Sequence, residues 1–104
     1  MRSTAPAVER LGLDKYYHGN EALHGIIRPG RFTVYPQAIA LASMWDPALV
    51  EEISGTISDE ARARWNALDQ GRAQTLAFTD LLTFWSPTVN MARDPRWGRT
   101  AETY

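Results

Sequence analysis

Apolar residues recur every three or four positions along one long segment of the sequence. They fall at Val50, Ile53, Ile57, Ala61, Trp65 and Leu68, whereas most charged side chains lie elsewhere around a helix axis. Asp46 is a good N-cap and Pro47 suits the first helical position, so the pattern predicts an amphipathic helix from Pro47 to about Leu68. Gly55 lies inside this helix at a cost of about 1 kcal/mol relative to alanine, and Gly71 fits a C-terminal cap.

A second pattern is the uninterrupted apolar run from Leu81 to Ser86, which holds two aromatic residues. Such a run is typical of a strand covered on both faces, as in a parallel sheet. Pro87 has no backbone N–H to donate, so regular pairing is expected to end near Ser86.

The remaining segments complete one β-α-β crossover. Pro36 to Met44 has almost no polar face and predicts a short buried helix. A short strand or turn is expected around Leu11 to Tyr17, and residues 73–80 have no assignment. The order strand, helices, strand is that of a β-α-β unit in an α/β protein.

One crossover leaves apolar surface uncovered, because its helix can protect only one face of two parallel strands. The other face, which carries part of Phe84 and Trp85, needs further strands and helices. We therefore expect an incomplete piece of a larger α/β protein, with Trp45, Trp65 and Trp85 in the core.

Composition narrows the choice of partners. The 104 residues are 44% hydrophobic and carry 11 basic and 12 acidic side chains, so the chain is expected to form one globular unit. The balanced, interspersed charge favours neither nucleic acid nor an anionic membrane as a partner. No apolar run approaches the roughly 20 residues of a membrane span, and the N-terminus does not resemble a signal peptide; the compartment stays open.

Cysteine and histidine limit the chemistry further. The chain has no cysteine, which excludes a disulfide, a thiolate metal site and a cysteine nucleophile. His18 and His24 have no carboxylate or cysteine at metal-ligand spacing, so no metal site is expected. His24 is expected to pack or hydrogen-bond within its own loop.

Two loops rich in polar side chains follow the predicted strands. The first runs from Tyr16 to Gly25, and the second follows Pro87. Loops at strand ends are where α/β proteins build binding sites. Taken alone, Glu21 in the first loop fits a helix-capping or solvated residue, and Arg99 in the second fits a surface or salt-bridging arginine.

Three motifs in fixed order give a more specific indication. They are Asn20-Glu-Ala-Leu-His-Gly25, then Thr33-Val-Tyr-Pro-Gln-Ala-Ile-Ala-Leu-Ala-Ser-Met-Trp-Asp46, and then Phe84-Trp-Ser-Pro-Thr-Val-Asn-Met-Ala-Arg-Asp-Pro-Arg-Trp-Gly-Arg99 with Glu102-Thr-Tyr104. From about Pro6 to Tyr104 the chain resembles the N-terminal part of glycoside hydrolase family 3, the β-glucosidases, β-xylosidases and related exo-acting enzymes. The resemblance implies a TIM-like (β/α) barrel, of which residues 1–104 would be an incomplete N-terminal portion.

The resemblance also assigns roles to side chains. It implies that Glu21 accepts hydrogen bonds from sugar hydroxyls and that Arg99 donates to them, both lining the subsite for the non-reducing terminal sugar. Glu102 is expected to orient Arg99. Trp97 is expected either to stack on a sugar face or to pack within the loop.

Asp94 is expected to bridge within a charge network formed with Arg93 and Arg96. This network would hold the second loop.

The catalytic carboxylates of this family are absent from the sequence. The resemblance implies a retaining hydrolase with an Asp nucleophile late in the barrel and a Glu acid/base from a following domain, roughly 5 to 5.5 Å apart. We therefore expect no catalytic residue and no cofactor in this chain, a β-linked oligosaccharide as ligand, and activity only with the remainder of the barrel and a following domain. The alternative is a non-catalytic small α/β interaction or carbohydrate-binding module.

Gly19 bears on the choice of sugar. Many β-xylosidase-like members of the family have tryptophan at this position, two residues before the acidic residue, where its ring would crowd a C6 hydroxymethyl group. Glycine is expected to leave room there, which would permit glucose as well as xylose.

Overall fold

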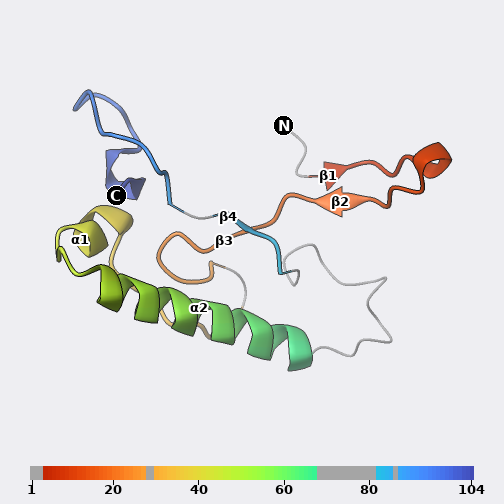
Figure 1. Cartoon of the computed structure of the whole chain (residues 1–104), viewed down its shortest axis with the longest axis horizontal. Coiled ribbons are helices and arrows are strands. Elements are labelled where there is room, and N and C mark those ends of the chain that lie inside the picture. Colours follow the sequence, from red (N-terminus) through yellow and green to blue (C-terminus); the bar gives the residue numbers. More distant parts are fainter. Residues whose placement is uncertain (1–3, 28–29, 68–81, 86) are drawn as a thin grey trace.

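The computed structural model describes residues 4–27, 30–67, 82–85 and 87–104 (Figure 1). Its elements in order are β1 (Thr4–Ala5), η1 (Glu9–Leu11), β2 (Tyr16–Tyr17), β3 (Asn20–Glu21), α1 (Ala38–Ala42), α2 (Pro47–Ala67), β4 (Phe84–Trp85) and η4 (Thr100–Glu102). The predictions made for Leu68, Gly71, Leu81 and Ser86 lie outside the described residues, as do the unassigned residues 73–80.

The N-terminal residues form a hairpin at one end of the molecule. β1 pairs with β2 in antiparallel register, with Thr4 opposite Tyr17 and Ala5 opposite Tyr16. Figure 1 shows this hairpin extending away from the two α-helices. The strand or turn expected around Leu11 to Tyr17 is therefore present, but it belongs to this hairpin and not to the parallel sheet.

The parallel pair is formed by β3 and β4, with Asn20 opposite Phe84 and Glu21 opposite Trp85. Asn20 is fully buried, and its side-chain Nδ2 donates to the carbonyl of Thr83 at 3.1 Å. Because β3, the helices and β4 follow one another, the predicted β-α-β order is confirmed. The prediction that Asn20 and Glu21 lie in a loop after the first strand is wrong, since parallel pairing draws them into the strand itself.

Helix α2 begins where the sequence predicts. The Asp46 side chain accepts a hydrogen bond from the backbone N–H of Leu49 at 3.0 Å, which caps the helix, and Pro47 occupies its first position. Among the described residues, a Cβ added to Gly55 would meet no atom within 4 Å beyond its own stretch of helix. Gly55 is thus a tolerated weakness in the helix and not a point of close packing.

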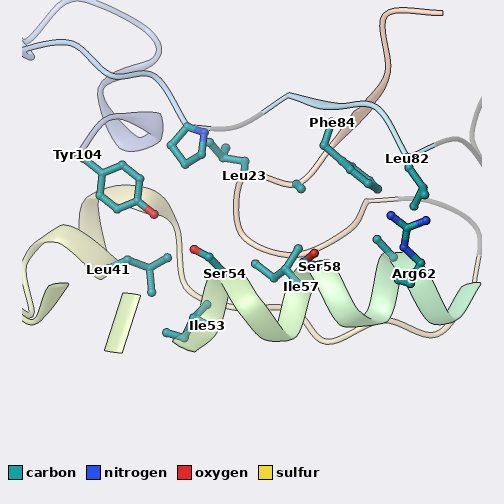
Figure 2. A pocket seen from close by; sticks show the side chains of 13 residues that line it. Leu23, Leu41, Ile53, Ser54, Ile57, Ser58, Arg62, Leu82, Phe84 and Tyr104 are labelled. Atoms are coloured by element: carbon teal, nitrogen blue, oxygen red, sulfur yellow. The ribbon is translucent and has the colours of Figure 1, made fainter. Parts of the chain in front are cut away.

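The apolar stripe of α2 faces the parallel strands without filling the space between them. A cavity of about 280 Å³ separates the two layers, and Ile53, Ile57 and Ala61 line its helical side. Figure 2 shows Leu82 and Phe84 reaching toward α2 from the opposite side. This mostly apolar gap is a loosely packed helix–sheet interface.

Helix α1 packs against the C-terminal end of the chain. It runs from Ala38 to Ala42 and is therefore shorter than the predicted range from Pro36 to Met44. Ala38 and Leu41 are buried whereas Ile39 is exposed, so the helix is buried on one side only. η4 packs against α1, and Figure 1 shows the C-terminus beside it.

Much apolar surface remains exposed. Trp45 is 92% exposed and Trp85 is 51% exposed, so the prediction that these two rings lie in the core is wrong for the chain by itself. The strand expected to be covered on both faces is likewise open at Trp85. The radius of gyration is 16.2 Å, against roughly 13 Å for a compact domain of about 100 residues.

The structure shows two parallel strands and no closed barrel within the described ranges. In the same part of the chain, neither α-helix combines the length and apolar character needed to cross a membrane.

Candidate functional site

One pocket brings the two predicted sugar-binding side chains together. It has a volume of about 440 Å³ and is lined by Glu21, Leu23, Trp85, Arg99 and Glu102. Glu21 and Arg99 are 78 positions apart in the sequence, so this juxtaposition depends on the tertiary fold.

The register of the parallel pair places the first wall of the pocket. Glu21 ends β3 and Trp85 ends β4, and the two residues are partners in the ladder. The backbone N–H of Ala22 donates to the carbonyl of Trp85 at 3.0 Å, which holds the strand ends in this register. In parallel pairs both carboxyl ends open at the same edge, so Glu21 and Trp85 reach the same pocket.

The second wall comes from the loop after β4. This loop is closed at its base, because the N–H of Thr88 donates to the carbonyl of Glu102 at 3.0 Å. The buried hydroxyl of Thr103 donates back to the carbonyl of Thr88 at 2.9 Å and also contacts the carbonyl of Asn90. These hydrogen bonds bring Arg99 back beside the end of β4, where it lines the same pocket as Trp85.

Arg99 is held by a carboxylate from its own 3-10 turn. Its Nε and Nη2 donate to Oε2 of Glu102 at 2.8 and 2.6 Å. Glu102 raises the pKa of the Arg99 guanidinium above its usual value, first through these hydrogen bonds and then through its charge, and the charge of Glu21 adds to the rise. The contact expected between Glu102 and Arg99 is therefore present, and Nη1 of Arg99 makes no hydrogen bond to any described residue.

Asp94 and Trp97 lie in a different part of the second loop. Asp94 accepts hydrogen bonds from Nε and Nη2 of Arg96 at 2.9 and 2.6 Å, and these bonds lower the pKa of its carboxyl. Arg93 instead donates to the side chain of Asn90 at 2.7 Å. The bridging role of Asp94 is confirmed for Arg96, while Arg93 stands apart from that pair.

Trp97 lines a separate pocket of about 290 Å³ together with Asn90, Met91, Arg93 and Asp94. This second pocket shares no lining residue with the pocket of Glu21 and Arg99. Stacking of Trp97 on a sugar stays a prediction.

Sequence reasoning missed Trp85 and Leu23 as residues of the site. Trp85 was assigned to the core because it ends an apolar run. Its position opposite Glu21 would have revealed it, but that position follows only from the parallel register.

Gly19 has a structural explanation. It is buried with φ of +47°, and a Cβ added there would lie 2.4 Å from the carbonyl oxygen of Thr83. The Cβ position of residue 19 is therefore blocked by backbone, while the room expected beside Gly19 for a hydroxymethyl group stays a prediction. Glycine is required here by the close approach of β3 to the residue before β4.

The pocket combines groups suited to a polyhydroxylated ligand. Glu21 offers acceptor oxygens, Arg99 offers donors at Nη1, and Trp85 offers an aromatic wall. No cluster of three or more metal-ligating His, Asp or Glu side chains occurs in the part of the chain that the structure describes. The pocket holds two carboxylates, Glu21 and Glu102, and Glu102 is bonded to Arg99.

Comparison with known proteins gives one consistent result. The chain is 38% identical to the xylan 1,4-beta-xylosidase of Xylanibacter ruminicola over its whole length and 44% identical to beta-D-xylosidase 1 of Arabidopsis thaliana over 97% of it. It is 39% identical, over 99% of its length, to beta-xylosidase/alpha-L-arabinofuranosidase 1 of Medicago sativa subsp. varia. It spans only 12 or 13% of the length of these relatives, and no solved structure matches it.

A family model covers most of the chain as well. The model described as the glycosyl hydrolase family 3 N terminal domain matches residues 9–104, which include β3, β4 and every residue of the Glu21–Arg99 pocket. The chain belongs to glycosyl hydrolase family 3.

Proposed function

We propose that this chain forms part of the terminal-sugar subsite of an exo-acting, retaining β-glycosidase that removes terminal β-D-xylosyl residues, or β-D-glucosyl residues, from oligosaccharides. The observation that carries the proposal is the pocket in which Glu21 and Arg99 meet. Family membership supports the hydrolase class, and the small share of its relatives that the chain spans supports a contribution to a larger catalytic unit.

In this proposal the chain binds the sugar and does not carry out bond cleavage. The Glu21 carboxylate accepts hydrogen bonds from hydroxyls of the terminal sugar, and Nη1 of Arg99 donates to them. Glu102 keeps the guanidinium in place through its bonds to Nε and Nη2. A site that pairs donors with hydroxyls discriminates strongly against ligands that leave those donors unsatisfied.

Xylosides are the favoured substrate class. The relatives compared are named for β-xylosidase activity, which supports this choice. The nucleophile and the acid/base belong to parts of the catalytic unit beyond these 104 residues, as does the remainder of the barrel. A self-contained binding module is less favoured, because exposed apolar residues such as Trp45 and Val89 need a covering partner.

A chimera tests this proposal. Residues 9–104 replace the matching segment of the xylan 1,4-beta-xylosidase of Xylanibacter ruminicola, and kcat/KM is measured with nitrophenyl β-xyloside and β-glucoside. We expect activity with a preference for the xyloside. A chimera that is folded and monodisperse yet inactive, beside an active parent enzyme, would overturn the proposal.

The contribution of Arg99 is tested in the same chimera. Arg99→Ala removes a charged donor, so kcat/KM is expected to fall by about 10- to 150-fold, the equivalent of about 1.5–3 kcal/mol. Arg10→Ala is the matched control, because Arg10 is an exposed arginine of η1 outside the pocket. An unchanged kcat/KM in Arg99→Ala removes this residue from the site.

A further inference from the structure

His24 and Tyr35 exchange two hydrogen bonds across the long connection between β3 and α1. The backbone N–H of Tyr35 donates to the backbone carbonyl of His24 at 2.8 Å. The ring Nδ1 of His24 lies 2.9 Å from the backbone carbonyl of Tyr35. Since a carbonyl oxygen can only accept, Nδ1 must carry the hydrogen.

The other ring nitrogen is matched to this tautomer. Nε2 of His24 lies 3.3 Å from Nε2 of Gln37. A neutral ring that carries its hydrogen on Nδ1 has a bare Nε2, which can accept from the Gln37 amide. Backbone and side chain together therefore fix the orientation of the imidazole.

The loop that His24 holds starts at a residue of the sugar pocket. The N–H of Ile27 donates to the carbonyl of Glu21 at 3.2 Å, which closes the intervening residues into a tight loop. Within it, Gly25 has φ of +109°, and a Cβ there would lie 2.3 Å from the Thr33 carbonyl oxygen. The loop also carries Leu23, which lines the pocket beside Glu21.

The segment on the far side of His24 is anchored to the long helix. Glu60 of α2 accepts hydrogen bonds from the backbone N–H of Thr33 at 3.0 Å and from its hydroxyl at 2.6 Å. A continuous series of contacts thus runs from α2 through Thr33 and Tyr35 to His24. It ends at the loop that presents Glu21 and Leu23.

We propose that His24 is a positioning residue for the sugar pocket, which acts through the Nδ1 hydrogen bond to Tyr35 to hold Glu21 and Leu23 against Arg99. This inference rests on the proposed function of that pocket. The ring itself stays outside the pocket, so its effect on a ligand is indirect. A misplacement of about 1 Å in a binding group can lower the rate about 100-fold, so fixing the position of this loop affects the reaction even though His24 does not touch the sugar.

Two substitutions in the chimera separate the hydrogen bond from the bulk of the side chain. His24→Leu keeps a similar volume without a donor, and kcat/KM with the β-xyloside is expected to fall at least tenfold, mainly in kcat. His24→Asn places an amide N–H at the same distance from the backbone as Nδ1, and it is expected to stay within about threefold of the unsubstituted chimera. Equal activity in all three proteins, or equal loss in both variants, would overturn the proposal.

A measurement on the 104-residue chain itself guards against a variant that does not fold. Long-range proton–nitrogen NMR of the His24 ring should report a protonated Nδ1 and a bare Nε2 in the neutral form. The opposite tautomer, or an equilibrium mixture as in a free imidazole, would overturn the proposal without reference to activity. An inactive unsubstituted chimera would instead count against the proposed function, so the two failures are distinguishable.

Discussion

The closure of the loop that carries Arg99 depends on one buried hydroxyl. Thr103 is 4% exposed, and its Oγ1 donates to the carbonyl of Thr88 at 2.9 Å. Thr103→Val replaces the hydroxyl by a methyl group of similar size, so the change removes a hydrogen bond with little change in packing. The base of the loop is therefore expected to open more easily.

The expected magnitude follows from the surroundings of the two acceptors. Leaving a buried polar group unpaired costs about 1–3 kcal/mol. Thr88 is only half-buried and Asn90 is exposed, so water can reach both carbonyls after a small opening. We therefore expect a loss of about 1–2 kcal/mol in the local opening free energy, which is a factor of about 5–30 in the opening equilibrium.

Hydrogen exchange at the Thr88 amide measures this opening directly, because that N–H donates to the Glu102 carbonyl across the base of the loop. Thr103→Val should speed its exchange by about 5- to 30-fold, while Thr103→Ser, which keeps the hydroxyl, should stay close to the unsubstituted chain. If Thr103→Val leaves the exchange rate within about twofold, or if Thr103→Ser is just as fast, the hydroxyl does not close the loop.

Three further predictions concern α2 and the second loop. Gly55→Ala should stabilise the chain against unfolding by about 0.5–1 kcal/mol, because a Cβ at this helical position meets no atom of another described segment within 4 Å; a denaturation midpoint that falls would contradict this. Asp46→Ala should cost about 1 kcal/mol and Asp46→Asn much less, since either side-chain oxygen can cap the N–H of Leu49; equal losses in the same measurement would exclude the cap. Arg96 lowers the pKa of Asp94 in the folded chain. The stability that this pair contributes is therefore fully present above the pKa that Asp94 has in the unfolded chain, and it is lost as the pH falls through the lower pKa of the folded chain. Arg96→Gln should raise the Asp94 titration midpoint in carboxyl-carbon NMR, and an unmoved midpoint would refute the pairing.

Local signals in the sequence were enough for the helical part of the fold. The spacing of apolar residues predicted α2, and Asp46 followed by Pro47 predicted its first residue, because capping and helical periodicity depend on neighbours within a few positions. The order of a β-α-β unit followed in the same way. The placement of β3 did not, because pairing between Asn20 and Phe84 joins residues 64 positions apart.

The residues of the candidate site differ in the same way in what the sequence alone could indicate about them. Glu21 and Arg99 were singled out only by the resemblance to glycoside hydrolase family 3, because taken alone they fit a capping or solvated residue and a surface arginine. Trp85 was missed, because an aromatic residue in an apolar run has the pattern of a core residue and its exposure depends on what covers the strand. The close approach of the Thr83 carbonyl to Gly19 likewise depends on the pairing of β3 with β4.

By itself the sequence determined the long helix with its cap, the β-α-β order and the family, and it named Glu21 and Arg99 as candidates for sugar binding. Only the tertiary structure decided that Glu21 and Arg99 share one pocket, that Trp85 forms part of its wall and that His24 is hydrogen-bonded to Tyr35. The physical reason is that helical periodicity and turn chemistry act over a few residues. A pocket is built from strand register and loop closure, which join distant parts of the chain.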